Sequence, residues 1–297
     1  MKYIIICYDK SKYTFPFINC NDCYIYNVYK KPNCNKIVKI IRKIIYFLGF
    51  KMSYIFYDEW CKYLLKDNVT FIVFDEAKPY FRLANILART KNKVFIYFRN
   101  PILHKKQINR LKKNFLVYTY SLNDSFEYKI NFNETFIPLI DSGPELEIYD
   151  CIFVGQNKNR LNLINKIYQI ASSPFFWVIK DGNEHINLPF LKEKTEALDY
   201  NDYIAFLKQS KAILEILPAQ GAGLTLRTAE AVLYNKKLIT NNNDLRNDEI
   251  FLSGNVLIFD ADLSKEDFLT FINEPIRPYS KALVKRFSVE EWLSRFK

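Results

Sequence analysis

The turn that contains Gly221 and Gly223 has the residue types and the setting best suited to binding an anion. It follows an apolar run, residues 212–217, that predicts a buried strand, and it leads into a predicted helix over residues 224–234. The first backbone N–H groups of a helix have no partner within the helix, and the helix dipole places partial positive charge there. Glycine lets a phosphate approach the backbone closely, and this turn holds two of the chain's seven glycines. The segment therefore predicts a phosphate site.

Elements of the same kind recur along the whole chain. Short β-rich runs alternate with helical patterns in the first half, and a second alternating series begins near residue 150. Such alternation is typical of parallel sheets covered by helices on both faces. We expect strands at residues 3–8, 70–74, 94–98, 116–120, 151–154, 175–179, 212–217, 237–240 and 255–259. We expect helices at residues 36–50, 80–90, 104–114, 161–171, 202–209, 224–234, 265–272 and 289–296.

Residues 130–148 lose this periodicity and carry Pro138 and the run Asp141-Ser142-Gly143-Pro144, which predicts a domain boundary. The expected fold class is α/β, with two Rossmann-like doubly wound domains in succession. We assign the N-terminal domain to residues 1–145, the C-terminal domain to residues 146–275, and a helical segment to residues 276–297.

The charge of the chain is concentrated in its first half. Residues 1–140 hold 24 Lys and Arg against 10 Asp and Glu, a net charge of +14, whereas residues 141–297 hold 19 against 22, a net charge of −3. A basic half indicates an anionic partner: a nucleic acid, a membrane surface or a phosphorylated substrate. A coding bias toward Lys, Ile and Asn is the alternative explanation, although it does not account for the difference between the halves.

Two classes of segment and site are not expected. No apolar run approaches the roughly 18 residues of a membrane span, and residues 3–8 are better explained as a strand than as a signal peptide. Cys20-x-x-Cys23 with Cys34 suggests zinc, but the spacing to Cys34 and Cys61 fits no common ligand pattern. We therefore predict reduced thiols, no metal site and a cytoplasmic protein. With only two histidines, a mechanism that needs two or three is nearly excluded.

The C-terminal half carries several motifs in a recognisable order. They are Phe153-Val154-Gly155 with Arg160; Gln220, Gly223-Leu224-Thr225, Arg227 and Glu230; residues 237–242; and residues 255–260. On these motifs, residues 150–297 resemble the donor-binding half of GT-B glycosyltransferases, most closely those of bacterial lipopolysaccharide, O-antigen and capsule synthesis. The resemblance implies two domains that face each other across a cleft, with residues 276–297 returning to the N-terminal domain. The first 145 residues match only in general architecture.

The resemblance also implies roles for individual residues. In this family a glutamate on the equivalent helix holds the ribose hydroxyls, and the preceding turn holds the diphosphate. Glu230 would thus bind ribose, the amides from Gly221 to Thr225 would bind phosphate, and Arg227 would neutralise the leaving diphosphate. A carboxylate is a good double acceptor for a vicinal diol, and preset donors with a cation stabilise a leaving anion. The other expected donor-site residues are Gly155, Asn157, Arg160, Lys180, Gln220 and Leu224.

Two departures leave alternatives open. Many retaining members carry a second glutamate eight positions before the ribose one, where this chain has Ala222, so the stereochemical outcome is not predicted. Asp260-Ala261-Asp262 matches the DxD motif with which GT-A enzymes bind a metal and a nucleotide. Acidic residues directly before a helix also cap it and suit its dipole, and we favour this second interpretation.

Polar residues follow three predicted strands of the N-terminal half. Asp9 follows the first strand, Asp75 and Glu76 follow the second, and Arg99 and Asn100 follow the third. Ligand crevices of α/β sheets lie at the carboxyl ends of strands. One of Asp9, Asp75 and Glu76 could be the catalytic base that deprotonates an acceptor hydroxyl, and we favour Asp75. Asp9, Arg99 and Asn100 are expected to bind the acceptor.

Residues 36–48 predict an amphipathic helix with apolar positions 37, 41, 44 and 48 on one face. Lys36, Lys39 and Lys43 cluster elsewhere on it. Such a helix either lies on an anionic membrane surface or is an ordinary core helix whose lysines extend to water.

These features together predict a cytoplasmic glycosyltransferase, peripheral at the inner face of the membrane. It would move a sugar from a nucleotide-sugar, a UDP-sugar by expectation, to an anionic bacterial surface glycan or glycolipid, with no cofactor, no metal and no nucleic acid partner. The alternatives are a metal-dependent GT-A transferase and a non-enzymatic nucleic-acid-binding protein. Against the latter, the 25 Phe and 21 Tyr mostly occupy apolar runs, and no RNA-binding signature accompanies them.

Overall fold

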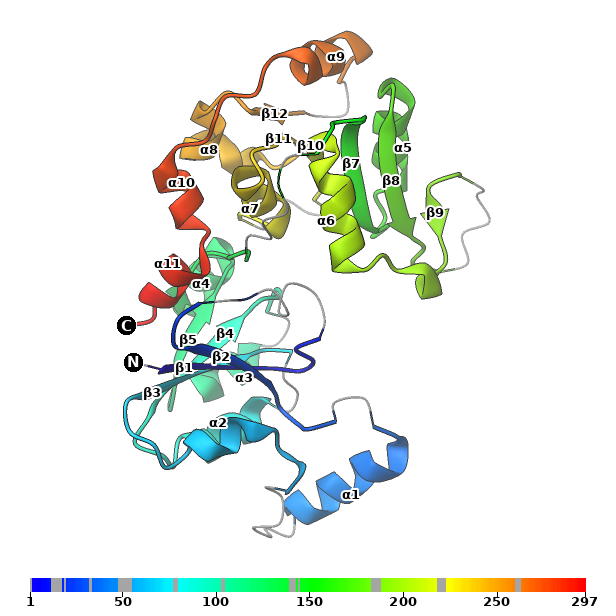
Figure 1. Ribbon diagram of the computed structural model, residues 1–297. Coiled ribbons are helices and arrows are strands. Elements are labelled where there is room, and N and C mark those ends of the chain that lie inside the picture. The colour runs from blue at the N-terminus through cyan, green and yellow to red at the C-terminus, as the bar shows by residue number, and fades with distance from the viewer. Residues whose placement is uncertain are drawn as a thin grey trace. The chain divides into compact units, whose positions relative to one another are not determined.

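The computed structural model of the protein forms two compact units (Figure 1). Unit 1 comprises Met1–Glu134 with Leu293–Lys297, and unit 2 comprises Thr135–Trp292. Each unit is built on its own six-stranded sheet. The structure describes the chain except for residues 1, 12–17, 19, 32–33, 48–54, 77–79, 103–104, 139–142, 144, 183–187, 218–222 and 260–262.

The sheet of unit 1 has the strand order β2-β1-β3-β4-β5-β6, and all its neighbouring strands are parallel. The strands are β1 (Lys2–Cys7), β2 (Cys23–Asn27), β3 (Val69–Phe74), β4 (Lys93–Phe98), β5 (Leu116–Thr119) and β6 (Asn131–Phe132). The helices are α1 (Lys36–Phe47), η3 (Glu59–Tyr63), α2 (Tyr80–Leu87), α3 (Lys105–Leu111) and α4 (Leu122–Tyr128). After β2 the chain returns to the other side of β1, so the topological switch point lies between β1 and β3.

Both faces of this sheet are covered, and β3 is buried along its whole length. On one face the core includes Trp60 from η3, Leu83 from α2 and Ile108 from α3. On the other face the ring of Phe296, near the chain's C-terminus, lies 4.8 Å from the ring of Tyr118. The last residues of the chain therefore complete the core of unit 1.

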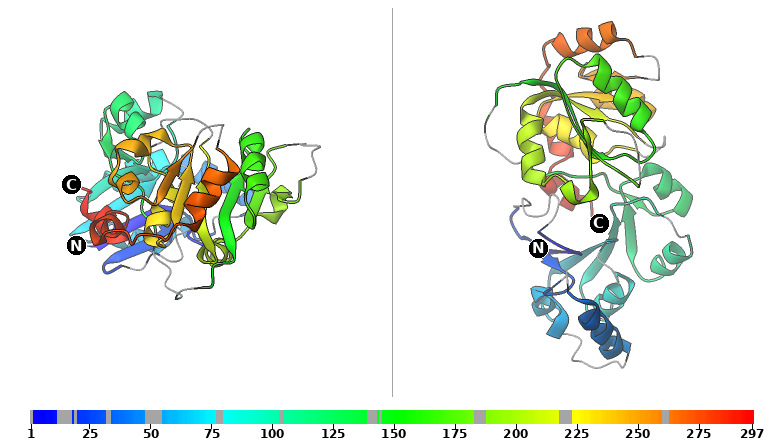
Figure 2. Two further views of the ribbon diagram at one scale, coloured as in Figure 1. Left: turned by 90° about the horizontal axis from the view of Figure 1, so that it is seen from above. Right: turned by 90° about the vertical axis from the view of Figure 1, so that its right-hand side faces the viewer.

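Helix α1 does not contribute its isoleucines to this core. It lies at the periphery of unit 1 in Figure 1 and in the right-hand view of Figure 2, and its isoleucines at positions 37, 40, 41 and 44 are exposed. The interpretation of α1 as an ordinary core helix is therefore wrong. Leu48, which the sequence placed on the same face, lies outside the described residues. Within the described part of the chain, no helix is both long enough and apolar enough to span a membrane.

The sheet of unit 2 has the strand order β12-β11-β10-β7-β8-β9 and is also parallel throughout. Its strands are β7 (Tyr149–Gln156), β8 (Pro174–Ile179), β9 (Leu191–Lys192), β10 (Ser210–Glu215), β11 (Lys237–Thr240) and β12 (Val256–Ile258). Its helices are α5 (Leu161–Ile170), η4 (Lys194–Glu196), α6 (Tyr200–Lys208), α7 (Leu226–Leu233), η5 (Asn243–Asn247), α8 (Glu249–Leu252), α9 (Lys265–Asn273) and α10 (Lys281–Arg286); α11 (Val289–Ser294) ends in unit 1. The switch point lies between β7 and β10.

Successive residues of these strands face opposite sides of the sheet, as the pleat requires. Ile152 and Ile213 pack on the side of the sheet that α6 and α7 cover. These two helices lie in front of the sheet in Figure 1. Phe153 and Leu214 pack on the side covered by α5 and α9. The expected class, α/β with two Rossmann-like doubly wound domains, is confirmed.

The boundaries of the expected strands and helices agree with the structure to within three residues. Strands β2, β6 and β9 and helices α4, α8 and α10 were not predicted. They are between two and seven residues long, and the three strands lie at or next to the edges of their sheets. Short peripheral elements bury too few side chains to show a clear apolar period.

Candidate functional site

The carboxyl ends of β7 and β10 meet at the switch point of unit 2, the position at which doubly wound sheets bind ligands. Side chains from three other segments reach these strand ends: the loop after β7, helix α7 and the end of β11. Two arginines, two buried glutamates and two asparagines form the arrangement.

Arg160 ties the loop after β7 to the end of β10. Its Nη2 donates to the carbonyl oxygen of Gln156 at 2.9 Å, and its Nε donates to that of Asn157 at 3.2 Å. Its Nη1 donates to the carbonyl oxygen of Ile216, directly after β10. All of these acceptors are backbone carbonyls, and no carboxylate of the described residues is hydrogen-bonded to the guanidinium.

Arg227, which is half-buried, and Glu230, which is fully buried, form an ion pair on α7, with Nη1 and Oε2 separated by 2.5 Å. Arg227 also donates from Nη2 to the carbonyl oxygen of Val154 at 2.9 Å, and its guanidinium lies over the ring of Tyr203 at 4.2 Å. The hydroxyl of Tyr203 donates to Glu230 Oε2 at 2.6 Å, and that of Tyr200 to Oε1 at 3.3 Å. Both carboxylate oxygens are thus engaged within unit 2. The ribose contact of Glu230 stays a prediction, and it requires that one of these oxygens be shared.

The two arginines are close enough to influence each other. Burial, and next the positive charge of Arg227, lower the pKa of Arg160 to about 10. Burial is the largest single influence on the pKa of Arg227 and would lower it, but the charge of Glu230, the two neighbouring tyrosines and the hydrogen bond to Glu230 together outweigh burial, and the net shift is upward. Both side chains are therefore cations at neutral pH, and a bound anion would relieve their repulsion.

A second buried carboxylate, that of Glu215, anchors the start of α7. It accepts hydrogen bonds from the hydroxyls of Thr225, Thr228 at 3.0 Å and Thr240 at 2.5 Å. Burial raises the pKa of Glu215, and these three hydrogen bonds lower it in part. Thr225 is also the N-cap of α7, since its Oγ1 accepts from the backbone N–H of Arg227 at 3.0 Å. Glu215 therefore fixes the helix that carries Arg227.

Two asparagines after β11 hold both ends of the turn between β10 and α7. Asn241 accepts from the backbone N–H of Leu217 at 2.7 Å and donates to its carbonyl oxygen at 3.2 Å. Asn242 donates to the carbonyl oxygen of Gly223 at 2.9 Å. Gly223 has a φ of +69°, which a residue with a side chain rarely adopts. Leu217 and Gly223, on either side of residues 218–222, are therefore both held from the segment that follows β11.

The loop after β7 is tightly turned. Lys158 and Asn159 have φ values of 47° and 59°, and the Oδ1 of Asn157 accepts from the backbone N–H of Arg160 at 3.2 Å. A Cβ at Gly155 would lie 3.4 Å from the Nη2 of Arg160, which is ordinary van der Waals contact and shows that Gly155 lies beside the guanidinium. The predicted residues Gly155, Asn157 and Arg160 thus lie together.

The structure does not place the other predicted donor-site residues among the side chains that meet at the switch point. Lys180 follows β8 and pairs with Glu193 at 2.7 Å. Leu224 packs against the core cluster beneath α6 and α7. Gln220 and Gly221 lie outside the described residues, so their phosphate contacts stay predictions.

Sequence reasoning missed five residues of this arrangement: Tyr200, Tyr203, Glu215, Asn241 and Asn242. A signal existed for Glu215, because a charged residue interrupts an apolar run, and for the asparagines, because polar residues directly follow a predicted strand. The tyrosines gave no local signal, since 27 residues separate Tyr203 from its partner Glu230.

A second polar cluster lies at the carboxyl ends of β3 and β4 in unit 1. Asp75 accepts from the backbone N–H of Arg99 at 2.9 Å and from Nδ2 of Asn100 at 3.0 Å. Burial raises the pKa of Asp75, and these hydrogen bonds lower it in part. The structure thus brings together three of the predicted residues, with both oxygens of Asp75 used within the cluster.

Glu76 is the second carboxyl group of this cluster, and it accepts fewer hydrogen bonds from the described residues than Asp75 does. Among the described residues, no donor makes a hydrogen bond to its buried Oε1, and Nη1 of Arg99 forms an ion pair with it at 3.6 Å. Burial raises its pKa, which the charge of Arg99 opposes. The thiol of Cys7, at the end of β1, has its pKa raised by burial and next by the charge of Glu76, which places the two groups near each other. Asp9 accepts from the backbone N–H and the hydroxyl of Ser11 at 3.1 and 2.6 Å.

Metal ligation finds no support among the residues that the structure describes. No group of three His, Cys, Asp or Glu there is arranged to hold an ion. The six cysteines are free thiols. Asp260 and Asp262 lie outside the described residues, so neither their capping role nor the DxD alternative is tested.

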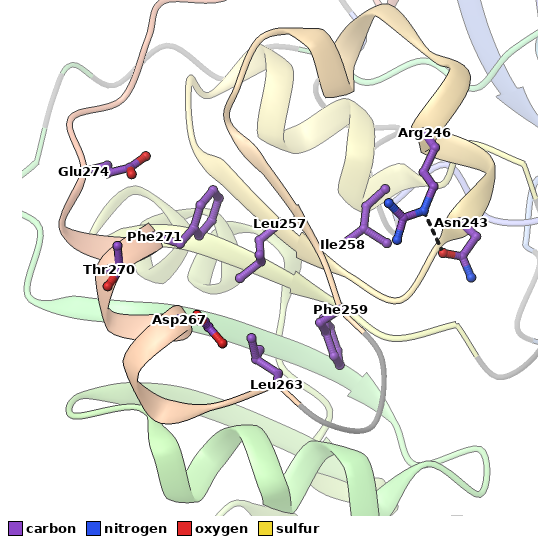
Figure 3. Close-up of a pocket in the computed structure, with 10 residues that line it drawn as sticks. All are labelled: Asn243, Arg246, Leu257, Ile258, Phe259, Leu263, Asp267, Thr270, Phe271 and Glu274. Carbon is purple, nitrogen blue, oxygen red and sulfur yellow. Dashed lines mark hydrogen bonds between the residues drawn. The ribbon is translucent and has the colours of Figure 1, made fainter.

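A pocket of about 500 Å³ lies at the free edge of β12, two strands away from the switch point (Figure 3). Its floor is mainly apolar, and Arg246 and Asn243 stand at one side, joined by a hydrogen bond of 3.3 Å. It contains none of the predicted donor residues. Its lining residues are Asn243, Arg246, Leu257, Ile258, Phe259, Leu263, Asp267, Thr270, Phe271 and Glu274.

No family model matches this chain, and neither does any curated protein. Solved structures do. AviGT4, a glycosyltransferase involved in avilamycin A biosynthesis, aligns over 100% of this chain and 96% of its own with 9% identity and a TM-score of 0.52. The chain has the fold of the GT-B glycosyltransferases.

Two further structures are similar at lower scores. The T4 phage β-glucosyltransferase covers 100% of this chain and 98% of its own, with 15% identity and a TM-score of 0.43. CalG4, the calicheamicin glycosyltransferase, covers 92% and 87%, with 12% identity and a TM-score of 0.37. At these identities the likeness concerns the fold, and function must be argued from the site.

Proposed function

We propose that the protein is a glycosyltransferase that binds a nucleotide-sugar, by expectation a UDP-sugar, at the switch point of unit 2. The observation that carries this proposal is the convergence of Arg160 and Arg227 at the carboxyl ends of β7 and β10. Two cations beside the N-terminus of a helix suit the diphosphate of such a donor. The GT-B fold supports this assignment.

In this proposal the arginines stabilise the leaving nucleoside diphosphate. Negative charge develops on the diphosphate as the bond to the sugar breaks, and donors fixed beforehand stabilise it without reorganisation. Arg160 is held by three backbone carbonyls, and Arg227 is held by Glu230, Val154 and the ring of Tyr203. We propose that these cations make a metal unnecessary, and that no cofactor takes part.

Glu230 would then have two functions. It keeps Arg227 charged and oriented, and it offers one oxygen to the ribose when the donor is bound. The weaker of its two tyrosine contacts, 3.3 Å from Tyr200 to Oε1, marks the oxygen that is easier to share.

Unit 1 would supply the acceptor side of the reaction. Asp75 is the predicted base, but its two oxygens already accept hydrogen bonds from Arg99 and Asn100. Glu76 has an oxygen that accepts no hydrogen bond from the described residues, and burial raises its pKa, which makes it a stronger base than an ordinary carboxylate. We therefore propose Glu76 as a rival to Asp75, with Asp9, Arg99 and Asn100 lining the acceptor site.

The acceptor that we propose is an anionic, lipid-linked bacterial surface glycan, such as a lipopolysaccharide, O-antigen or capsule precursor, at the inner face of the cytoplasmic membrane. The net charge of +14 in residues 1–140 supports an anionic acceptor. The motifs of the C-terminal half support the bacterial surface-glycan lineage.

A thermal-shift screen with UDP, GDP, CMP and their sugars tests the donor assignment. A ligand present at 100 times its dissociation constant stabilises the folded state by about 2.7 kcal/mol. We expect a clear rise in melting temperature with one nucleoside diphosphate and its sugar, and none with inorganic sulfate at equal ionic strength. A protein that responds to no nucleotide at millimolar concentration would refute the proposal.

A further inference from the structure

Helix α1 carries a stripe of four exposed isoleucines, which we call the isoleucine stripe. The exposed fractions are 65% for Ile37, 55% for Ile40, 42% for Ile41 and 52% for Ile44. Their spacing of three and four residues places them within an arc of about 100° on one side of the helix. Large apolar side chains that are exposed singly are ordinary, but a contiguous helical stripe marks a contact surface.

The other side of α1 is the one attached to unit 1. Arg42 stacks on the ring of Tyr29 at 4.0 Å and donates from Nη2 to the sulfur of Cys34 at 2.8 Å. Val38 is half-buried, like Arg42. These contacts fix the rotation of α1, so the isoleucine stripe faces away from the unit that carries it.

The charge of α1 identifies the kind of surface that would cover the stripe. Lys36, Lys39 and Lys43 are exposed and occupy the arc directly beside the isoleucines, and the helix contains no acidic residue. An apolar stripe bordered by lysines is the pattern of helices that lie in the boundary between headgroups and acyl chains of an anionic bilayer. Pairing with a second copy of α1 would instead bring like charges together, which disfavours it.

We propose that α1 docks the protein on an anionic phospholipid bilayer by inserting the isoleucine stripe, while its three lysines contact the lipid phosphates. This inference rests on the proposed function for its purpose, because a lipid-linked acceptor lies at such a surface. Its support is the structure of α1 alone, and it can be tested without donor or acceptor.

The test is flotation of the full chain with vesicles of phosphatidylcholine, with and without phosphatidylglycerol. One variant, Ile40→Ser with Ile44→Ser, removes half of the stripe, and Ile37→Ser with Ile41→Ser is an independent second one. A charge variant replaces Lys36, Lys39 and Lys43 with glutamine. Control variants change exposed residues elsewhere: Leu65→Ser with Leu252→Ser, which are more exposed than the isoleucines, for the apolar change, and Lys93, Lys106 and Lys113 to glutamine for the charge change.

We expect the wild type and both controls to float with phosphatidylglycerol vesicles and to bind pure phosphatidylcholine much more weakly. Each isoleucine pair and the lysine triple should lower the partition coefficient at least about tenfold. Because the changed side chains are exposed, the melting temperature should stay within a few degrees of the wild-type value. Three results would overturn the proposal: no binding by the wild type, binding that both isoleucine pairs leave intact, or a dimer by light scattering that these pairs dissociate while vesicles do not bind. Nucleotide-induced thermal shifts, measured in parallel, decide the proposed function separately.

Discussion

Replacement of Glu230 by alanine should destabilise unit 2 strongly. The side chain is fully buried, lies 2.5 Å from Arg227 and accepts hydrogen bonds from two tyrosine hydroxyls. Removal of one member of a buried ion pair leaves an uncompensated charge and costs about 3–5 kcal/mol, and the lower end of that range applies here because 27% of the Arg227 side chain is exposed to water. For a domain of roughly 150–250 residues, 1 kcal/mol shifts the melting temperature by about 2–4 °C, so a drop of roughly 6–12 °C is expected.

Differential scanning calorimetry of a small series checks this reasoning. Glu230→Gln keeps the size of the side chain and loses only the charge, so its melting temperature should fall less than that of Glu230→Ala. Tyr203→Phe removes one hydrogen bond to the carboxylate, worth about 1.5–3 kcal/mol. Glu266→Ala, on the exposed first turn of α9, is the control and should cost less than about 1 kcal/mol.

A fall of less than about 2 °C for Glu230→Ala would refute the buried ion pair. The same series also separates stability from binding. If Glu230→Gln remains folded at the assay temperature but loses nucleotide affinity, the carboxylate contributes to donor binding beyond its support of Arg227.

Three further outcomes are expected. Glu76→Gln should lower kcat at least about 100-fold and abolish the acidic limb of the pH–rate profile, whereas Asp75→Asn should act mainly on KM or stability; the reverse pattern would return the role of base to Asp75. Because burial raises the pKa of Glu215, the folded protein holds that proton to higher pH than the unfolded chain does. Its contribution to stability therefore falls as pH rises from about 4.3 through the raised pKa. Urea unfolding at several pH values should show this slope in the wild type and not in Glu215→Gln. Activity should survive EDTA and the change of Asp260 and Asp262 to asparagine, and loss of activity restored by manganese would favour the DxD alternative.

The fold could be predicted from the sequence because its central strands are nearly continuous apolar runs. β3 is buried at all six positions and consists only of β-branched and aromatic residues, and β10 is buried at five, with Ala212, Ile213 and Leu214 as its apolar centre. β2, with the sequence Cys-Tyr-Ile-Tyr-Asn, lies at the edge of its sheet; Cys23 and Ile25 are half-buried and Tyr24 is exposed. Edge strands of this kind show neither a continuous run nor a strict alternation, and this one was missed.

The sequence predicted the candidate site only in part, namely where its residues are close to one another in sequence. Arg160 and Arg227 could be predicted because each lies near the end of a predicted strand or the start of a predicted helix. What the sequence did not show is that Glu230 would be enclosed by Tyr200 and Tyr203, because that contact depends on how α6 packs beside α7. The sequence also did not predict that the isoleucines of α1 are exposed, because an amphipathic pattern does not show whether another element covers its apolar face.

The central claim is that Arg160 helps to bind a nucleoside diphosphate at the β7–β10 switch point, and isothermal titration calorimetry tests it most directly. UDP, or whichever nucleotide most stabilises the wild type, is titrated into the wild type, Arg160→Met and Arg246→Met, with each variant's melting temperature recorded. Arg246 lines the pocket at the β12 edge, so its variant removes an arginine from the same unit at a different cavity. Loss of a charged hydrogen-bond donor costs about 1.5–3 kcal/mol, so Arg160→Met should weaken binding roughly 10- to 150-fold while Arg246→Met leaves affinity within about twofold. Undiminished affinity in a folded Arg160→Met, or loss of binding in Arg246→Met alone, would contradict the account.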